Sequence, residues 1–458
     1  MKVCMFVTNN CKYDHRVLKE AKTLTDAGHE VRIIAILDKN TEPYEERDGF
    51  RIIRVTRDPI HYQVLRAVKK QPTLFFAIAW IRIPLRLLYV WLRRPLRMAY
   101  RRIRRPLRVA YRRIRRPLRV AYRWIQRFIY TRLRAFLLVF HRPLSLIDYY
   151  RRSWQAIKDE PADVYHSHDL TTLPIGYIAK RRSGGQLVYD SHELFTEVSG
   201  LGSFERRIFH FLEKRLIHRA DGVVTVSESI AQELSNRYGV ALPNIIMNCP
   251  PRLVLKLGYY KSTLRKKLGL NDTVPIILFV GGYSPGRGLH NLILSAHHIN
   301  EGIVVFMGWG KLEEELKDLV REEDLGDRVL FARPVPPDDV VREITSASLG
   351  VAITQFVCLN NYYGSPNRLF EYVNAGLPVV GSNFPEVKRI VEGYRLGKTF
   401  DPEDPRDIAA AINWVLLDKK RYEEMKQNAL KAAEIFNWKN EAKKLLTLYQ
   451  RLESAKND

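Results

Sequence analysis

The chain has 458 residues and carries 75 Lys and Arg against 50 Asp and Glu, which gives a formal net charge of +25. The 89 residues from Pro59 to Ile147 contain 21 Arg, 2 Lys and no acidic residue, so 23 of the excess charges lie there and the rest of the chain is almost neutral. This distribution excludes a uniformly basic protein that coats nucleic acid, and a hydrophobic content of 46% excludes a disordered one.

The chain begins with an apolar run that predicts a buried strand. Val3–Thr8 is followed by Asn9 and Asn10 and lacks the long apolar core and the cleavage site of a secretion signal. The four cysteines form no CxxC pair and have no histidine partners at zinc spacing, so neither a disulfide framework nor a structural metal site is indicated. We therefore expect a cytoplasmic protein.

In the first half of the chain, outside the basic stretch, short apolar strands alternate with amphipathic helices. This alternation predicts an α/β domain with a parallel sheet and helices on both faces. The expected strands are Val3–Thr8, Val31–Ile36, Ile52–Val55, Val164–His166, Leu187–Tyr189 and Gly222–Val226. The basic stretch interrupts this domain after its third strand, so the domain is expected to comprise residues 1–58 and 151–248.

The basic stretch, residues 59–150, contains a repeat of eleven residues. RRPLRMAYRRI, RRPLRVAYRRI and RRPLRVAYRWI follow one another without a gap from Arg93. Eleven residues make three helical turns, so Leu96, Tyr100 and their equivalents return to one face and most arginines to the other. The pattern predicts a basic amphipathic helical insertion, kinked at the proline that each unit contains.

A membrane surface could bind both the apolar face and the basic face of this insertion. Arginines interrupt the apolar runs, which are shorter than the roughly 20 residues of a bilayer span, whereas a basic amphipathic helix can lie in the interface of an anionic leaflet. The residues expected to bind the membrane are Trp80, Trp91, Arg94, Arg97, Arg105, Arg108, Arg116, Arg119 and Trp124. Two alternatives stay open: a charged arm packed on another domain or subunit, and a nucleic-acid-binding arm, which leaves the apolar stripe without a use.

The second half of the chain repeats the alternation of strands and helices. Its expected strands are Ile276–Val280, Ile303–Met307, Val329–Phe331, Leu349–Ile353 and Pro378–Val380. They predict a second parallel-sheet domain, residues 249–435. Two such sheets form a cleft between the carboxyl ends of their strands, where open α/β sheets bind ligands.

The segment GSPNRLFEYVNAGLPVV, which begins at Gly364, has the signals of a capped helix. Ser365 suits the N-cap and Pro366 suits the first helical position. Gly376 suits the stop, because glycine readily adopts the left-handed conformation found after many helices. The segment therefore predicts a helix over Pro366–Ala375.

Two loops of this domain are candidates for a diphosphate site. Arg368 stands near the N-terminus of the expected helix, where free N–H groups favour a phosphate, and Glu371 could accept hydrogen bonds from sugar hydroxyls. Gly281 and Gly282 directly follow a strand and allow close approach of the backbone, and Arg287 stands at the entrance of the next helix. For the first loop, the alternative is an ordinary capped helix with Glu371 in an ion pair.

Four segments together resemble one known family. They are DHRVLKEAKTLTDAGHEVRIIA from Asp14, HSHDLTTLPIGYIAKRRSGGQLVYDSHELF from His166, PNRLFEYVNAGLPVV from Pro366 and FNWKNEAKKLLTLYQRL from Phe436. In combination they resemble the retaining glycosyltransferases of family 4, and the resemblance covers almost everything except residues 59–150. It implies the GT-B fold, with two Rossmann-like domains facing a cleft and a final helix, residues 436–458, that crosses back onto the first domain.

The resemblance also implies an activity, the transfer of a sugar from a nucleotide diphosphate sugar without a cofactor or a bound metal. Glu371 matches the glutamate that holds the ribose, and Arg287 matches the basic residue that contacts the diphosphate. His192, in DSHE, resembles the histidine near the reacting sugar; the alternative is a histidine that only satisfies the core. His192, Arg287 and Arg368 are the expected catalytic residues. The expected donor site consists of Gly281, Gly282, Arg287, Ser365, Asn367, Arg368 and Glu371.

The acceptor side of the cleft is expected to contain His192, His168 and Asp169. His166, His168 and Asp169 could in principle bind a metal, but their position at a strand end fits a polar cleft wall better.

Two positions depart from the family pattern. Tyr363 stands where many members have a glutamate that contacts the donor sugar, and Gly282 stands where a basic residue is usual. Asn367 and Arg368 are expected to reach the phosphates instead.

The leading hypothesis is a hexosyltransferase bound to the inner face of the cell membrane. Its expected partners are a nucleotide sugar, an anionic membrane surface and a lipid-linked or membrane-associated acceptor in polysaccharide or glycoconjugate biosynthesis, and not nucleic acid. Two alternatives are another GT-B activity, such as a sugar-nucleotide epimerase or phosphorylase, and a non-catalytic membrane adaptor, which the loss of the glutamate at Tyr363 supports.

Overall fold

The computed structural model describes residues 1–70, 124, 127–128, 130–138, 140–252 and 264–457. The expected membrane contacts Trp80, Trp91, Arg94, Arg97, Arg105, Arg108, Arg116 and Arg119 lie outside these residues. Trp124 is described and is 67% exposed. The chain divides into two compact units. Unit 1 comprises Met1–Ala35, Tyr44–Ile53 and Glu160–Asp458, and unit 2 comprises Ile36–Pro43 and Arg54–Asp159.

The first sheet has the strand order β3-β4-β2-β1-β5-β6-β7-β8. Its strands are β1 (Lys2–Phe6), β2 (Glu30–Ile36), β3 (Tyr44–Arg47), β4 (Phe50–Val55), β5 (Val164–His168), β6 (Gln186–Ser191), β7 (Gly222–Thr225) and β8 (Asn244–Ile245). β1 pairs in parallel with β2 and β5, and β5 to β8 continue in parallel. The predicted parallel sheet is confirmed. The sequence did not predict β3 and β8: β3 pairs antiparallel with β4, which overlaps the expected strand Ile52–Val55, and β8 pairs in parallel with β7.

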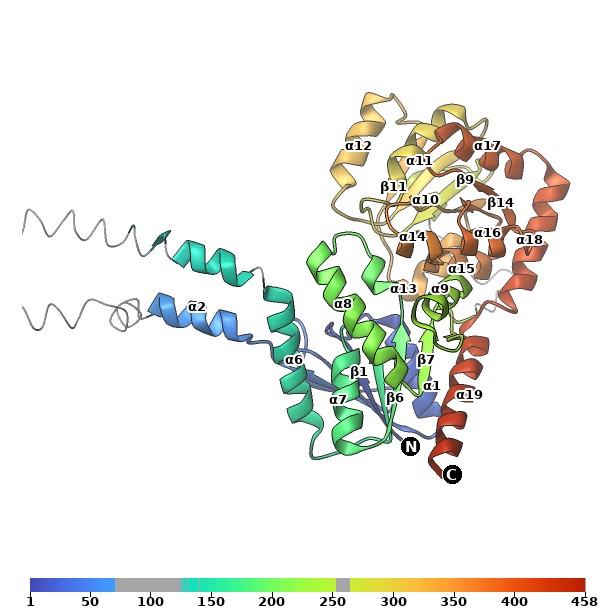
Figure 1. The fold of residues 1–458 in the computed structure, drawn as a ribbon. Helices are drawn as coiled ribbons and strands as arrows, with labels where there is room; N and C mark the ends of the chain where they lie inside the picture. Colours follow the sequence, from blue (N-terminus) through green and yellow to red (C-terminus); the bar gives the residue numbers. More distant parts are fainter. Residues whose placement is uncertain (71–123, 125–126, 129, 139, 253–263, 458) are drawn as a thin grey trace, which may run out of the picture. The chain divides into compact units, whose positions relative to one another are not determined.

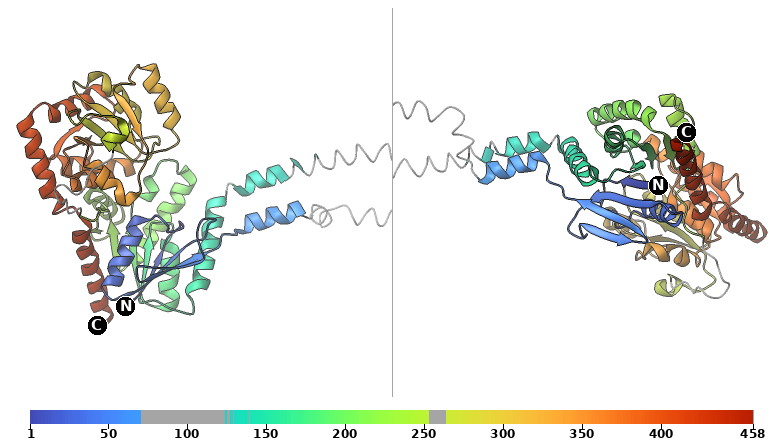
Figure 2. Two further views of the ribbon diagram at one scale, coloured as in Figure 1. Left: turned by 180° about the vertical axis from the view of Figure 1, so that it is seen from behind. Right: turned by 90° about the horizontal axis from the view of Figure 1, so that it is seen from below.

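The helices of the first sheet include one from the far end of the chain. They are α1 (His15–Asp26), α7 (Leu173–Ser183), α8 (Ser203–Leu216), α9 (Glu228–Tyr238), the short η1 (Phe195–Glu197) and η2 (Ile217–Arg219), and α19 (Trp438–Asn457). The dark red α19 lies beside the blue α1 in Figures 1 and 2. Leu445, Leu448 and Tyr449 of α19 belong to the same buried cluster as Val3 and Met5 of β1.

The second sheet is parallel throughout, with the order β11-β10-β9-β12-β13-β14. Its strands are β9 (Ile276–Val280), β10 (Ile303–Met307), β11 (Val329–Ala332), β12 (Leu349–Ala352), β13 (Val379–Ser382) and β14 (Gly397–Phe400). Ile276, Leu278 and Val280 pack into one apolar cluster, and Ile277 and Phe279 into the other. Since successive side chains of a strand point to opposite faces, each cluster covers one face of the sheet.

Helices supply the outer layers of the second sheet. They are α10 (Leu264–Leu268), α11 (Leu289–Ser295), α12 (Glu313–Glu322), α13 (Pro337–Ile344), α14 (Leu359–Tyr363), α15 (Asn367–Asn374), α16 (Pro385–Val391), α17 (Pro405–Leu416), α18 (Lys419–Ala433) and the short η3 (Ala296–His298). The two sheets give the predicted α/β architecture. The domain boundary expected between residues 248 and 249 stays a prediction.

The helix predicted over Pro366–Ala375 is present but begins one residue later, as α15 (Asn367–Asn374). Ser365 is therefore not its N-cap: Pro366 holds that position, in an extended conformation, and no side chain caps the helix. The extended ψ of 133° at Pro366 keeps it outside the helix. Gly376, with a φ of 71°, follows the helix in the left-handed conformation that the sequence predicted there.

Unit 2 contains two helices, α2 (Ile60–Lys70) and α6 (His141–Ile157), which pack against each other. His61 Nε2 lies 2.9 Å from His141 Nδ1, and the N–H of Asp58 donates to Asp148 Oδ2 at 2.9 Å. These contacts join the two ends of the basic stretch. None of the helices that the structure describes is both long enough and apolar enough to cross a bilayer.

Candidate functional site

A cavity of about 580 Å³, which we call cavity 1, lies within unit 1 at the carboxyl ends of strands from both sheets. Its walls are formed by residues that follow β6, β7, β9, β10, β11 and β12, together with the start of α15. All residues of the expected donor site line it: Gly281, Gly282, Arg287, Ser365, Asn367, Arg368 and Glu371. His192 lines it as well. The fold thus brings together residues up to 179 positions apart in the sequence.

Arg368 and Arg287 face cavity 1, and in the described part of the chain neither forms an ion pair with a carboxylate. Arg368 is only 6% exposed; its guanidinium lies 4.4 Å from the ring centre of Phe279 and donates to the carbonyl oxygen of Ile353 at 3.2 Å. Burial, and then the charge of Arg287, lowers the pKa of Arg368 to about 10, and burial lowers the pKa of Arg287. Two partly desolvated cations without a carboxylate in ion-pair contact favour the binding of an anion.

Two glycine-containing loops pack closely at cavity 1. A Cβ on Gly308 would lie 1.9 Å from the carbonyl oxygen of Gly281, and a Cβ on Gly310 would lie 2.2 Å from that of Tyr283. The N–H of Tyr283 donates to the carbonyl oxygen of Trp309 at 2.8 Å. The Gly-Trp-Gly segment is therefore needed for packing, because any side chain at its two glycines would push the loops apart.

Glu371 lies on α15, one turn after Asn367, and lines cavity 1. Burial raises the pKa of its carboxyl, against the opposing charges of Arg368 and Lys19. Within the described residues Glu371 does not form the ion pair that the alternative of an ordinary capped helix assumed. The carboxylate is available to accept hydrogen bonds from a ligand.

His192 joins cavity 1 to a group of buried polar side chains. Its Nε2 lies 3.1 Å from Nδ1 of His168 and 3.3 Å from Oδ2 of Asp190, and its Nδ1 lies 3.6 Å from Oδ2 of Asp169. Burial alone would lower the pKa of His192, but Asp169 and Asp190 outweigh it and raise the pKa to about 9. Burial, and then His166, lowers the pKa of His168. These opposite shifts favour the charged form of His192 and the neutral form of His168, so that His192 can donate to His168.

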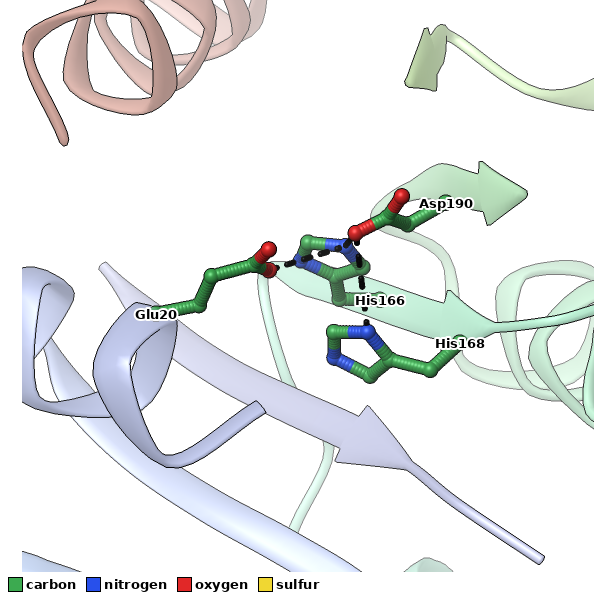
Figure 3. A group of neighbouring side chains, drawn as sticks. All are labelled: Glu20, His166, His168 and Asp190. Atoms are coloured by element: carbon green, nitrogen blue, oxygen red, sulfur yellow. Dashed lines mark ion pairs between the residues drawn. The ribbon is translucent and has the colours of Figure 1, made fainter. Parts of the chain in front are cut away.

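Figure 3 shows a buried cluster of potential metal ligands: Glu20, His166, His168 and Asp190. Two of them, His168 and Asp190, also contact His192. One ligand atom of each lies within 4.8 Å of the others. Asp169, which the sequence grouped with the two histidines as a possible ligand, is not part of this cluster.

Arg16 already supplies the positive charge that a metal would bring to this cluster. Its guanidinium donates to Oδ1 and Oδ2 of Asp190 at 2.9 and 2.8 Å and lies 3.1 Å from Oε1 of Glu20. Burial alone would raise the pKa of Asp190, but the Arg16 charge outweighs it and holds the pKa well below its usual range. A metal would have to displace this guanidinium, so the residues fit a buried ion-pair network better than a metal site.

A second cavity of about 550 Å³, which we call cavity 2, shares His192, Val226, Ser365 and Asn367 with cavity 1. Its other walls are polar residues of the loop after β1, the start of α1 and the segment after β8: Asn9, Asn10, Tyr13, Asp14, His15, Arg16 and Asn248. Of the three residues expected on the acceptor side, His192 lines this cavity, whereas His168 and Asp169 line neither. Instead, both contact the side chain of His192.

Several residues that line the cavities were not predicted as site residues. Glu193 and Trp309 line cavity 1, and Asn9, Asn10 and Asp14 line cavity 2. A signal for them was present, because each follows the carboxyl end of a parallel strand, the edge at which open α/β sheets bind ligands.

Two family models match the chain. Residues 261–432 match the model described as Glycosyl transferases group 1, and residues 108–247 match the model described as Glycosyltransferase Family 4. The chain belongs to this glycosyltransferase family. It is a retaining enzyme that uses a nucleotide sugar as donor, as the resemblance implied.

Two curated relatives show the extent of the similarity in sequence. A D-inositol 3-phosphate glycosyltransferase from Nocardioides sp. is 27% identical over 316 residues, which are 63% of this chain and 67% of that protein. An alpha-maltose-1-phosphate synthase from Mycolicibacterium smegmatis is 24% identical over 318 residues, 64% of this chain and 80% of that protein.

Solved structures share the fold over nearly the whole chain. Sucrose-phosphate synthase from Thermosynechococcus elongatus has a TM-score of 0.70 at 17% identity, covering 99% of this chain and 100% of that one. The Anabaena protein HepE, in complex with UDP-glucose, has a TM-score of 0.64 at 15% identity, covering 100% of this chain and 99% of that one. The predicted GT-B fold is confirmed.

Proposed function

We propose that this glycosyltransferase moves a hexose from a nucleotide diphosphate hexose to a lipid-linked or membrane-associated acceptor, at the inner face of the cell membrane, in polysaccharide or glycoconjugate biosynthesis. The observation that carries the donor assignment is the pair Arg287 and Arg368, two partly desolvated cations that face cavity 1 without a carboxylate partner in the described part of the chain. UDP-glucose is the first donor to test, because HepE has been solved with it bound.

The chemical problem is the departure of the diphosphate. As the bond between the anomeric carbon and the phosphate oxygen breaks, negative charge grows on the diphosphate, so cationic donors stabilise the transition state more than the bound donor. Arg287, Arg368 and the first turn of α15 would supply that stabilisation, and Glu371 would hold the ribose. The acceptor hydroxyl oxygen forms the new bond to the anomeric carbon, and its proton passes to the departing phosphate.

Cavity 2 is the proposed acceptor site. It adjoins cavity 1 at His192, Ser365 and Asn367, so an acceptor hydroxyl bound there would meet the donor sugar at the shared wall. Amide and carboxylate side chains such as Asn9 and Asp14 suit a hydroxyl-rich acceptor, because they offer both hydrogen-bond donors and acceptors.

Exposed aromatic side chains support attachment to a membrane surface. In unit 2, Trp124 and Phe128 are 67% and 48% exposed, and the guanidinium of Arg132 lies 5.2 Å from the ring centre of Phe128. In unit 1, α8 exposes Phe204 and Phe211 by 69% and 58%. Aromatic rings beside arginines suit the interface of an anionic leaflet, where the rings lie at headgroup depth.

The transfer reaction is tested by incubating the full-length protein with membrane extracts and a panel of nucleotide sugars. Mass spectrometry of the product identifies both the sugar transferred and the class of acceptor. A new glycolipid supports the proposal. Conversion of the donor into an epimer, or a sugar phosphate product, would favour the other GT-B activities, and donor binding without turnover across the panel would favour an adaptor.

Membrane attachment is tested by replacing residues 71–139 with a Gly-Ser linker of about ten residues, which retains the packed helices α2 and α6. The variant should lose flotation with anionic liposomes but keep donor binding, and transfer to a membrane acceptor should fall more than transfer to a short soluble analogue. Salt should weaken attachment of the intact protein without abolishing it, because it screens the charges only. Preference of the intact protein for duplex DNA or RNA over anionic lipid would overturn the membrane assignment.

A further inference from the structure

Glu193 places a carboxylate on the first-sheet side of cavity 1. It follows β6 and lines cavity 1 but not cavity 2, whereas its neighbour His192 lines both. The hydroxyl of Ser191 donates to the carbonyl oxygen of Glu193 at 2.8 Å, which holds the backbone in place. Glu193 therefore belongs to the donor side of the site, one residue from the wall that the two cavities share.

A side chain from the second-sheet side orients this carboxylate. Asn360, on α14, donates from Nδ2 to Oε2 of Glu193 at 3.3 Å and accepts at Oδ1 from the N–H of Leu194 at 2.9 Å. Among the described residues, Oε1 of Glu193 has no hydrogen-bond partner. One oxygen is thus held by the protein, and the other is available to a ligand in cavity 1.

The position at which many family 4 enzymes carry a glutamate does not line the cavity in this chain. Tyr363 occupies that position, and it is absent from the described residues that line cavity 1. Its carbonyl oxygen accepts from the hydroxyl of Ser227 at 2.9 Å, and its ring lies 5.3 Å from that of Tyr362. Within the described residues, the carboxylates that line cavity 1 are therefore Glu193 and Glu371.

We propose that Glu193 accepts hydrogen bonds from hydroxyl groups of the donor sugar and so selects a neutral hexose over a uronic acid. The inference rests on the proposed function. Glu371 shares α15 with Arg368, where the ribose and diphosphate would bind, whereas Glu193 adjoins His192, where the sugar would meet the acceptor. An ionised carboxylate accepts hydrogen bonds from hydroxyls but repels another carboxylate, so a uronate would be disfavoured there.

The test compares Glu193→Gln with the wild-type full-length protein, using UDP, UDP-glucose and UDP-glucuronate in calorimetric binding and in transfer assays. The affinity for UDP should stay within twofold. The ratio of the affinity for UDP-glucose to the affinity for UDP should fall about tenfold or more, because a hydrogen bond to a charged group is lost. The value of kcat/KM should fall by a similar factor. The ratio of UDP-glucuronate to UDP-glucose affinity should rise.

Two further variants separate this role from a structural one. Asn360→Ala removes the contact to Glu193 but keeps the carboxylate, so it should keep the preference for UDP-glucose over UDP-glucuronate. Glu228→Gln, an exposed glutamate paired with Arg389, should behave as the wild type. If Glu193→Gln keeps the wild-type sugar preference, or if it loses UDP affinity as much as UDP-glucose affinity, the inference is overturned. If the wild type binds none of the three nucleotides, the proposed function with a uridine donor fails together with it.

Discussion

Two buried arginines of unit 1, Arg16 and Arg368, have opposite electrostatic surroundings. Arg16 is 4% exposed, donates three hydrogen bonds to Asp190 and contacts Glu20, so carboxylates surround its charge. Arg368 is 6% exposed and forms no ion pair with a carboxylate within the described residues, and the charge of Arg287 lowers its pKa by more than the charge of Glu371 raises it. Burial lowers the pKa of both, but only for Arg16 do the carboxylates reverse the direction and raise it.

This difference indicates that Arg16 stabilises the fold, whereas Arg368 is placed to bind an anionic ligand. Removing one member of a compensated buried pair leaves the other charge unpaired, which destabilises the protein. An uncompensated buried cation is itself unfavourable and is retained where a ligand supplies the missing charge. The two regions should therefore respond to substitution in opposite ways.

The largest expected effect is on folding, at Arg16. Arg16→Met leaves Asp190 and Glu20 buried without their guanidinium, and it should lower the free energy of unfolding by about 3–5 kcal/mol. Urea denaturation monitored by circular dichroism measures it. Arg321→Met is the matched control, because Arg321 is 72% exposed and pairs with Asp318, so it should change stability by less than about 0.5 kcal/mol. A loss below about 1 kcal/mol at Arg16 would remove the distinction between the two arginines.

The next effect is on catalysis, at the donor site. Arg368→Met and Arg287→Met should each lower kcat/KM for transfer by about 10- to 100-fold, because each removes a charged hydrogen bond to the diphosphate. Stability should stay within about 1 kcal/mol, since each change also removes a repulsion between two cations.

Arg368→Lys serves as the control for that experiment. It keeps the charge but not the planar fork, so its activity should lie between those of the wild type and Arg368→Met. Transfer within twofold of wild type for both methionine variants would contradict the proposed diphosphate contacts.

The strands of the second sheet show how much of the fold could be predicted. β9 (Ile276–Val280) and β10 (Ile303–Met307) match the predicted bounds residue for residue, because continuous apolar runs mark strands buried on both faces. β3 (Tyr44–Arg47) was missed because Tyr-Glu-Glu-Arg has no apolar face to signal burial. Ser365 was wrongly placed as an N-cap because composition cannot show which residue before a helix is extended.

The donor site could be predicted only in part, because some of its contacts join residues far apart in the sequence. Local signals such as glycines after β9 and the arginine at the start of α15 pointed to residues that do line cavity 1. The contact between Arg16 and Asp190 joins residues 174 positions apart, and the contact between Glu193 and Asn360 joins residues 167 apart. No local pattern reports such pairs, because they arise from the way the elements pack.

The third expected effect is a pH dependence of stability that originates at His192. Its folded pKa of about 9 lies above the ordinary value of 6.5, so its contribution to stability is fully present below pH 6.5 and is lost as the pH rises through about 9. We expect a loss of about 1–2 kcal/mol over this range, less than the full shift implies, because His192 titrates together with its neighbours.

Comparison with His192→Gln isolates this contribution in urea denaturation at pH 6.5 and pH 9.5. Lys19, whose pKa burial lowers to about 8, adds a slope of the opposite sign, but it is present in both proteins and cancels in the difference. The free energy of unfolding of the wild type should exceed that of His192→Gln by less at pH 9.5 than at pH 6.5. If the difference in free energy of unfolding between the two proteins is the same at both pH values, His192 is not held in its charged form.

The smallest expected effect is on nucleotide affinity, at Glu371. Glu371 is the carboxylate closest in sequence to Arg368. If Glu371 served as the counter-charge of Arg368, Glu371→Gln would lower the free energy of unfolding, as substitution within the Arg16 network does. Because Glu371 forms no ion pair in the described part of the chain, stability should instead be unchanged or slightly higher, since burial already disfavours its charged form. Its proposed partner is the ribose, and loss of one hydrogen bond there is worth about 1 kcal/mol, which corresponds to about a fivefold weaker affinity for UDP in calorimetry. Unchanged affinity together with lower stability would reverse this assignment and make Glu371 part of the protein's own charge balance.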